Sequence, residues 1–256
     1  SVLQVVFNIY RVRYFFLAPI VLGLLGCGFE FNRTFDSDEN IQSTERLSTD
    51  SLSTDSKETD SDSDYAHIPD FAIVGFATVD EITIGGKGGT IAEPLNSAEL
   101  KEYLLNDAPL IIRINSIIEL SERLDVSSNK TIEGVGSNTG ITGAGLRLTG
   151  VNNIIIRNLK FYGSVEDALS IENNAHHIWI DHNDFSNSQD GLVDIKTGAS
   201  YVTISWNRFS NQNMVCLIGA SDSHSETDSG KLRITLHHNW FDNTTQQHPR
   251  CRFGEV

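Results

Sequence analysis

Basic side chains are scarce in this sequence, which has 19 Lys and Arg residues against 34 Asp and Glu and a formal net charge of −15 at pH 7. They form no basic face and no nucleic-acid-binding motif, so the sequence argues against DNA or RNA as a partner. The acidic excess is uneven, because residues 30–70 hold twelve acidic and three basic residues and so carry most of the net charge.

Cysteine is equally scarce, with Cys27, Cys216 and Cys251 as the three in the chain. Their spacing fits no disulfide framework, although a bond between Cys216 and Cys251 stays open as an alternative. Cys216 lies in an apolar strand pattern, and we expect it to be a small buried residue.

Long apolar runs are also missing, apart from one near the start of the sequence. Residues 14–26 follow Arg11 and Arg13 and are too short to span a bilayer comfortably, which is typical of a secretory signal. The run ends in Leu24-Leu25-Gly26-Cys27 and resembles a bacterial lipoprotein signal, in which Cys27 becomes the lipidated first residue. We interpret residues 1–27 as a signal peptide of this type; the alternative is an uncleaved anchor. Both predict an extracytoplasmic bacterial protein, secreted or on the outer surface, that touches the membrane only through this segment.

Residues 28–70 lack any apolar periodicity. They are rich in Ser, Thr, Asp and Glu and include a Ser-Asp-Ser-Asp tract. Such a segment buries too little apolar surface to offset the entropy of an ordered chain, so we predict a disordered acidic tether. A calcium-binding acidic tail is the alternative, but the segment has no spaced ligands and no Gly turn.

What the sequence does have is a repeat in its second part. Four copies of one eight-residue pattern start at Ile154, Ile178, Val202 and Ile234, each with apolar residues at its first and third positions and Phe at its eighth. The first three copies start 24 residues apart and the fourth starts 32 residues later, so the last coil holds an extra loop of about eight residues. Alternation with a period of two predicts strands with one buried face.

A second apolar ladder runs between these copies. Its pairs are Leu146/Leu148, Leu169/Ile171, Val193/Ile195 and Leu217/Ile218. Strands that recur at a fixed period with no helix between them predict an all-β fold, a single-stranded parallel β-helix over residues 71–256. A Greek-key β domain is the alternative.

Stacked coils would align equivalent side chains. We expect the Phe residues to form one internal column, and Asn183, Asn207 and Asn239 to bond from coil to coil at one turn. Residues 97–105 predict a short amphipathic helix, capped by Ser97, that covers the open first coil.

Three aspartates are the strongest candidates for chemistry. Asp167 and Asp190 lie 23 residues apart, about one coil, so their carboxylates should lie on adjacent coils about 5 Å apart, with Asp194 close by. Three carboxylates at that separation repel each other unless a cation lies among them or one is protonated. Oxygen ligands favour a hard cation, and Ca²⁺ above Mg²⁺. The alternative is that one or two of these aspartates point outward as solvated turn residues.

Several motifs together carry a family resemblance. They are Ile178-Trp-Ile-Asp-His182, Asp190-Gly-Leu-Val-Asp-Ile-Lys196, Leu217-Ile-Gly-Ala-Ser-Asp222, Ile234-Thr-Leu-His-His-Asn239 and Pro249-Arg-Cys-Arg-Phe-Gly254. In this order, over residues 71–256, they resemble the extracellular pectate lyases and their pectin lyase relatives. The resemblance implies a right-handed parallel β-helix that cleaves an acidic polysaccharide, pectate or homogalacturonan, by Ca²⁺-dependent β-elimination.

The resemblance also implies roles for single residues. Asp167, Asp190 and Asp194 fall on the family's calcium positions, whereas Lys196 and Arg252 fall on basic residues that line the substrate cleft. Asp181 and His182 fall on a motif that is mainly structural in such proteins.

The sequence departs from the family at two functional positions. Gln247 stands where the family has its catalytic Arg, two residues before Pro249, and Met214 stands where relatives carry a Lys that holds a substrate carboxylate. Glutamine is no useful proton acceptor near neutral pH and methionine has no charge. His248 or Arg250 could substitute for the missing base.

Three functions therefore stay open: a working pectate lyase, a surface-tethered pectate-binding protein without catalysis, and a purely structural β-helix. The aspartate trio and Lys196 count against the third. Relatives continue for several more coils. We therefore expect this sequence to be a fragment that aggregates or pairs through its last coil, and the full-length protein to be a monomer.

Overall fold

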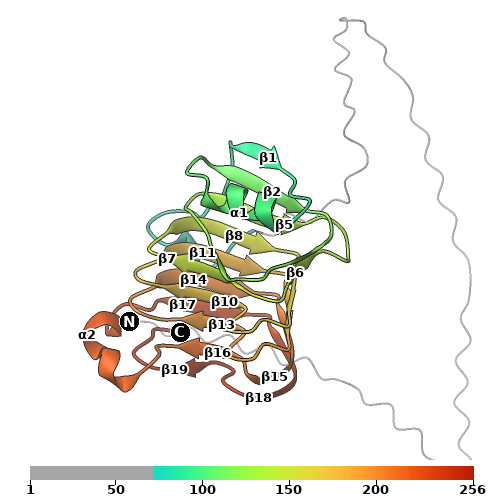
Figure 1. Cartoon of the computed structure of the whole chain (residues 1–256). Coiled ribbons are helices and arrows are strands. Elements are labelled where there is room, and N and C mark those ends of the chain that lie inside the picture. Colours follow the sequence, from blue (N-terminus) through green and yellow to red (C-terminus); the bar gives the residue numbers. More distant parts are fainter. Residues whose placement is uncertain (1–71) are drawn as a thin grey trace, which may run out of the picture. The chain divides into compact units, whose positions relative to one another are not determined.

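The computed structural model of the chain describes residues 72–256, which form a parallel β-helix (Figure 1). The repeat therefore predicted the fold correctly. The signal segment expected at residues 1–27 and the acidic tether expected at residues 28–70 lie outside the described residues. Within residues 72–256, no helix has the length and apolarity needed to cross a membrane.

Each full coil contributes one strand to each of three sheets, and neighbouring strands are parallel. Sheet A consists of β1 (Thr90–Ala92), β2 (Leu110–Ile114), β5 (Lys130–Gly134), β8 (Asn152–Arg157), β11 (His176–Asp181), β14 (Ser200–Ser205) and β17 (Ile234–His237). Sheet B consists of β3 (Ile117–Glu119), β6 (Gly140–Thr142), β9 (Lys160–Tyr162), β12 (Asp184–Ser186), β15 (Arg208–Met214) and β18 (Trp240–Gln246). Sheet C consists of β4 (Leu124–Asp125), β7 (Leu146–Thr149), β10 (Leu169–Glu172), β13 (Val193–Ile195), β16 (Cys216–Ile218) and β19 (Arg250–Cys251).

The interior is built from columns of equivalent side chains. Phe161, Phe185 and Phe209 are fully buried, and the rings of successive members lie 4.9 and 5.4 Å apart and nearly parallel. Phe241 continues this column at 5.2 Å. The predicted phenylalanine column is confirmed, because inward positions separated by one coil face each other across the strand spacing.

The predicted asparagine ladder is confirmed as well. The side-chain amide of Asn183 donates to Asn207 Oδ1 (3.0 Å), and that of Asn207 donates to Asn239 Oδ1 (3.1 Å). The same amides donate to the carbonyls of Ile156 and Ile180, so this turn is bonded both along and between coils.

One pair of the second ladder was assigned wrongly. Cys216 and Ile218 align with Val193 and Ile195, whereas Leu217 aligns with Asp194 on the outer face. Cys216 is fully buried as expected, but the two described cysteines do not bond to each other. Both are free thiols, and Cys251 aligns with Ile218 rather than with Cys216.

Helix α1 (Ser97–Leu105) lies at the β1 and β2 end of the stack (Figure 1). Its fully buried Leu100 and Leu104 belong to the core, as the amphipathic pattern predicted. The predicted cap was wrong by one residue, because Asn96 accepts the Glu99 amide (3.0 Å) and Ser97 is the first helical residue.

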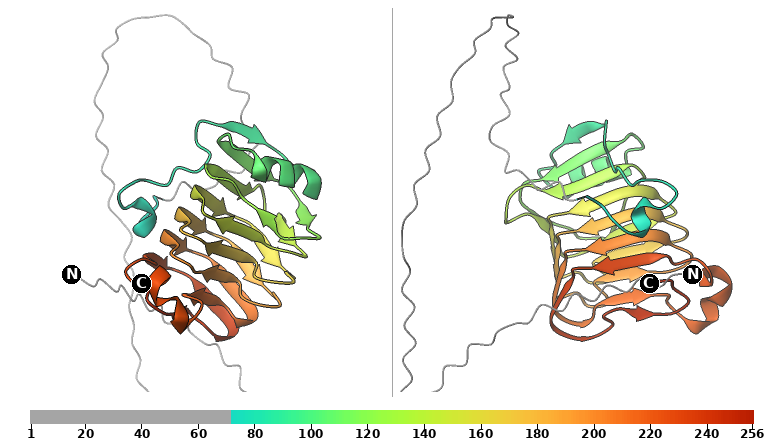
Figure 2. Two further views of the ribbon diagram at one scale, coloured as in Figure 1. Left: turned by 60° about the vertical axis from the view of Figure 1, so that its left-hand side comes forward. Right: turned by 180° about the vertical axis from the view of Figure 1, so that it is seen from behind.

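The segment before β1 lies along the outer face of sheet A (Figure 2). It contains the 3-10 helix η1 (Phe76–Thr78). Outward threonine side chains on three strands accept from its backbone: Thr235 from Phe76, Thr203 from Ala77 and Thr131 from Gly86.

The extra residues of the last coil form a loop between β16 and β17, which projects beside the stack (Figure 1). The loop contains η2 (Asp222–His224) and α2 (Ser225–Asp228). Asp228 is fully buried, and its Oδ1 accepts the amide of Gly198 (2.7 Å), two residues after Lys196.

Candidate functional site

The outer face of sheet C carries the predicted site residues. Along its central row, register aligns Arg147, Ser170, Asp194, Leu217 and Arg250 on successive strands. Asp194 is the acidic side chain in the middle of this row, and Arg250 lies two strands away from it.

The remaining predicted residues lie at the two edges of this face. Asp167, Asp190, Met214 and Gln247 precede β10, β13, β16 and β19, where backbone hydrogen bonds join successive coils. Lys196 and Arg252 directly follow β13 and β19 at the opposite edge. The structure brings Lys196 together with Asp167 and Asp194, while the roles of all the predicted positions stay predictions.

Two of the three aspartates are buried beside Lys196. Asp167 and Asp194 are 6% and 7% exposed. Lys196 Nζ lies 3.4 Å from Asp167 Oδ2 and 3.9 Å from Asp194 Oδ2. Asp190 is exposed at the turn before β13, and its charge helps to raise the pKa of both Asp167 and Asp194.

Burial changes the protonation of this group. Burial, supported by the negative charge of Asp167, raises the pKa of Asp194 to about 7 from an ordinary value of 3.8, and Lys196 opposes the change. Burial also raises the pKa of Asp167, where Lys196 and the Gly191 amide act in the opposite direction. The two carboxyl groups are thus held where an additional positive charge would stabilise their ionised forms.

The donor chemistry fits a calcium ion in one respect. Asp194 Oδ1 is buried and has no hydrogen-bond partner among the described residues, and carboxylate oxygens are the ligands that Ca²⁺ prefers. A Cβ at Gly191 would lie 2.4 Å from Asp194 Oδ1 and 3.1 Å from Asp167 Oδ1, so only glycine leaves room beside both oxygens. Within residues 72–256, however, the structure contains no group of three or more Asp, Glu, His or Cys side chains close enough together to hold a metal ion.

The two substituted positions follow along the same edge. Met214 is half-buried and aligns with Gln246 on β18. Gln247 is half-buried with a φ of 64°, and its carbonyl accepts the Cys216 amide (2.9 Å). His248 and Arg250, on either side of Pro249, are exposed.

Two acidic residues that the sequence did not single out pair with the basic ones. Glu172 Oε2 lies 3.9 Å from Lys196 Nζ, and Asp222 Oδ1 accepts from Arg252 Nε (2.8 Å). The contact between Glu172 and Lys196 could have been predicted, because the two residues are one 24-residue coil apart. The contact between Asp222 and Arg252 involves a residue of the irregular loop, so the coil repeat does not predict it.

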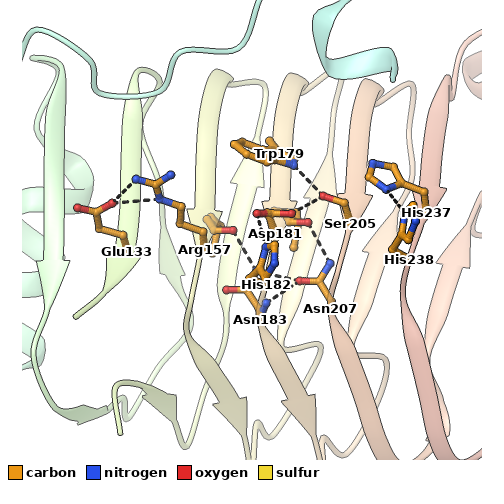
Figure 3. A network of polar contacts seen from close by, with 12 residues as sticks. Glu133, Arg157, Trp179, Asp181, His182, Asn183, Ser205, Asn207, His237 and His238 are labelled. Atoms are coloured by element: carbon orange, nitrogen blue, oxygen red, sulfur yellow. Dashed lines mark hydrogen bonds and ion pairs between the residues drawn. The ribbon is translucent and has the colours of Figure 1, made fainter. Parts of the chain in front are cut away.

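Asp181 and His182 belong to a separate network on sheet A (Figure 3). Asp181 is buried and accepts from Ser205 Oγ (2.5 Å) and His182 Nδ1 (2.6 Å), while Ser205 Oγ accepts from Trp179 Nε1 (2.8 Å). Because both carboxylate oxygens are engaged, the network stabilises the strand stack, which agrees with the structural role that the motif implied.

Comparison with known proteins gives consistent results. The family model described as pectate lyase matches residues 69–256. The pectate trisaccharide-lyase of Thermotoga maritima is 38% identical over 198 residues, which cover 72% of this chain and 53% of that protein. The pectate trisaccharide-lyase of Bacillus licheniformis is 35% identical over 207 residues, covering 73% and 60%. The chain thus spans between half and three fifths of the length of these relatives.

Solved structures give the same result for the fold. The thermostable pectate lyase PL 47 superposes with a TM-score of 0.66 at 29% identity, covering 71% of this chain and 68% of that one. The pectate lyase Bsp165PelA from Bacillus sp. N165, solved in complex with trigalacturonate, superposes with a TM-score of 0.65 at 29% identity, covering 72% and 65%.

Proposed function

The chain belongs to the pectate lyase family, and from that premise we propose that the outer face of sheet C binds pectate and cleaves it by β-elimination, with Asp167, Asp190 and Asp194 as calcium ligands. The observation that carries this proposal is the pair of buried carboxyl groups beside Lys196, with Arg252 on the same strand edge. A solvated turn would not place carboxylates, an ammonium and a guanidinium along one face.

β-Elimination on a uronate requires removal of the C5 proton next to a carboxylate that is already negative. When bound, calcium would neutralise that carboxylate and stabilise the enolate-like charge as a Lewis acid. In this proposal, Lys196 and Arg252 bind and orient further substrate carboxylates through charge-assisted hydrogen bonds. Arg252 must exchange Asp222 for the substrate, which is feasible because the Asp222 side chain is 90% exposed.

A second candidate function follows from the Gln at position 247, because the family resemblance implies a catalytic Arg there. A positioned base contributes typically 10²- to 10⁴-fold to the rate, and an amide side chain supplies none. The second function is therefore calcium-dependent binding of pectate with little or no turnover. For either function, we propose that the protein acts outside the cytoplasm, as the N-terminal signal pattern suggests.

The experiment compares the wild type with Gln247→Arg, Met214→Lys, the double variant and Asp194→Asn on polygalacturonate. The ultraviolet absorbance of the unsaturated product measures cleavage, and retardation in a polygalacturonate gel measures binding, each with Ca²⁺ or EDTA. For a lyase we expect calcium-dependent product from the wild type, none from Asp194→Asn, and a rate at least about 10²-fold higher in Gln247→Arg.

Retardation of the wild type with product from the double variant alone would establish the binding function. If neither protein makes product and calcium causes no retardation, both functions are wrong. When the wild type is active, His248→Ala and Arg250→Ala identify the substitute base, since the variant that removes it loses activity while its retardation in the gel is unchanged.

A further inference from the structure

A second concave site lies away from the sheet C face. A cavity of about 350 Å³ opens where β11 and β14 begin, and its lining shares no residue with the proposed pectate site. The lining consists of Asp80, Glu81, Asn174, His176, His177, Ser200, Tyr201, Lys231 and Arg233. This volume lies in the range of small-ligand sites, and the lining is rich in hydrogen-bonding groups.

The lining presents two cations, Lys231 and Arg233. The ring of His177 stacks on Tyr201 (4.9 Å between centroids), and the guanidinium carbon of Arg233 lies over the Tyr201 ring at 5.4 Å. Stacking restricts the guanidinium plane of Arg233, and its contact with Glu255 is long, at 3.8 Å. Lys231 is exposed and makes no ion pair within residues 72–256. Both cations are therefore available to an anionic group.

The lining also presents hydrogen-bond acceptors. Asp80 and Glu81 are exposed, and Asp80 accepts the Tyr201 hydroxyl, which raises the pKa of Tyr201. Asn174 adds an amide that can donate and accept. A lining that holds both carboxylates and cations suits a ligand that carries hydroxyl groups and one negative charge.

The two histidines define one more acceptor. His177 Nε2 lies 3.0 Å from the Val79 carbonyl, which can only accept, so His177 Nε2 carries the proton. His176 Nδ1 lies 2.7 Å from His177 Nδ1, and with the His176 proton in this contact the His176 Nε2 is an acceptor. Burial lowers the pKa of His176, which keeps this ring neutral near pH 7.

We propose that this pocket is an accessory binding site for one hexuronate unit of an acidic polysaccharide. Lys231 and Arg233 bind its carboxylate, while Asp80, Glu81 and His176 accept from its hydroxyl groups. A neutral sugar leaves the two cations without a partner, and a phosphate dianion is repelled by the two carboxylates. The choice of galacturonate as probe rests on the proposed function, whereas the pocket itself does not.

The test is a titration of the full chain with galacturonate in EDTA, followed by NMR signals of the His176 and Tyr201 rings. EDTA removes calcium, so binding at sheet C and binding at the pocket are separated. We expect saturable shifts of these rings in the wild type and at least tenfold weaker binding of galactose, which lacks only the carboxylate.

The variants locate the site. Lys231→Ala and Arg233→Gln should each weaken galacturonate binding at least tenfold, while Lys87→Ala, an exposed lysine outside the pocket, should leave it unchanged. Thermal unfolding midpoints equal to that of the wild type will establish that the pocket variants fold.

Three results would overturn the proposal: no shift with galacturonate, equal affinity for galactose, or full competition by inorganic phosphate at equal concentration. A protein that makes no unsaturated product and shows no calcium-dependent retardation, but binds galacturonate in EDTA, would refute both proposed functions and keep the pocket. A protein that makes unsaturated product but does not bind galacturonate in EDTA would support the lyase and refute the pocket.

Discussion

At the scale of single residues, Asp194 is a buried acidic side chain with a strongly altered protonation equilibrium. Its carboxyl group is buried, one oxygen has no hydrogen-bond partner among the described residues, and its pKa is raised to about 7. The folded state therefore binds a proton at Asp194 more readily than the unfolded state does. This difference favours folding at low pH and is lost as the pH rises from about 4 through about 7.

Replacing Asp194 with Asn should therefore stabilise the calcium-free protein above pH 7, because the amide has no charge to desolvate. We expect the unfolding midpoint of Asp194→Asn in EDTA to exceed that of the wild type by a few degrees at pH 8 and to match it near pH 4. Calorimetry at the two pH values measures this. Glu119→Gln, which neutralises an exposed carboxylate, should change neither midpoint. A lower midpoint for Asp194→Asn at pH 8 would contradict the electrostatic argument.

Gly191 is the second informative residue, because its missing side chain leaves the space beside two carboxylates. A methyl group there would lie 2.4 Å from Asp194 Oδ1 and push it away. Gly191→Ala should lower calcium affinity at least tenfold, as measured by calorimetric titration. Unchanged affinity would mean that calcium does not use this side of Asp194.

At the scale of elements, the turn between sheets A and B depends on its buried asparagines. Asn207 exchanges hydrogen bonds with Asn183, Asn239 and the Ile180 carbonyl. Asn207→Ala leaves buried backbone and amide groups without partners, so we expect a loss of about 2–4 kcal/mol in the free energy of unfolding. Urea denaturation measures it. Asn213→Ala, on the exposed side of β15, should stay within about 0.5 kcal/mol of the wild type, and similar losses in both would argue against the ladder.

The loop between β16 and β17 is hydrogen-bonded to the turn that carries Lys196, and we expect this bond to hold the turn in place. Asp228 is fully buried and accepts the Gly198 amide. In Asp228→Ala we expect hydrogen exchange at the Gly198 amide to accelerate at least tenfold, while the Gly219 amide, which donates to Ile195, keeps its protection. NMR exchange rates test this. Asp222→Ala, in the exposed part of the same loop, is the control, and acceleration there too would indicate general loosening.

At the scale of the whole molecule, calcium should stabilise the fold, because the proposed ligands come from adjacent coils. A ligand present at 100 times its Kd adds about 2.7 kcal/mol to the stability of the folded state. We therefore expect Ca²⁺ to raise the unfolding midpoint of the wild type, Mg²⁺ to raise it less, and neither ion to do so in Asp194→Asn. An equal rise in Asp194→Asn would move the calcium site elsewhere.

The sequence predicted those features that repeat with the coil. The phenylalanine column and the asparagine ladder follow from the coil repeat, which is 24 residues between the first three copies and 32 before the last. Asp194, which the sequence placed close to Asp167, shares Lys196 with it in the structure. Features without a period escaped prediction, namely the strap of residues 74–86 on sheet A, the Asp222–Arg252 pair and the mixed-charge pocket. Each brings together residues far apart in sequence at spacings set by loops. The wrong assignment of Leu217 has the same origin, because the lengths of the connections to β13 and β16 differ.

The threonine contacts of the strap have a mechanical consequence. Thr131, Thr203 and Thr235 belong to three different coils, yet they hold one short stretch of backbone. Any bending of the stack along its axis would have to break these bonds in turn. The strap therefore fixes the relative positions of β5, β14 and β17, and we expect it to make the stack of coils rigid along its axis.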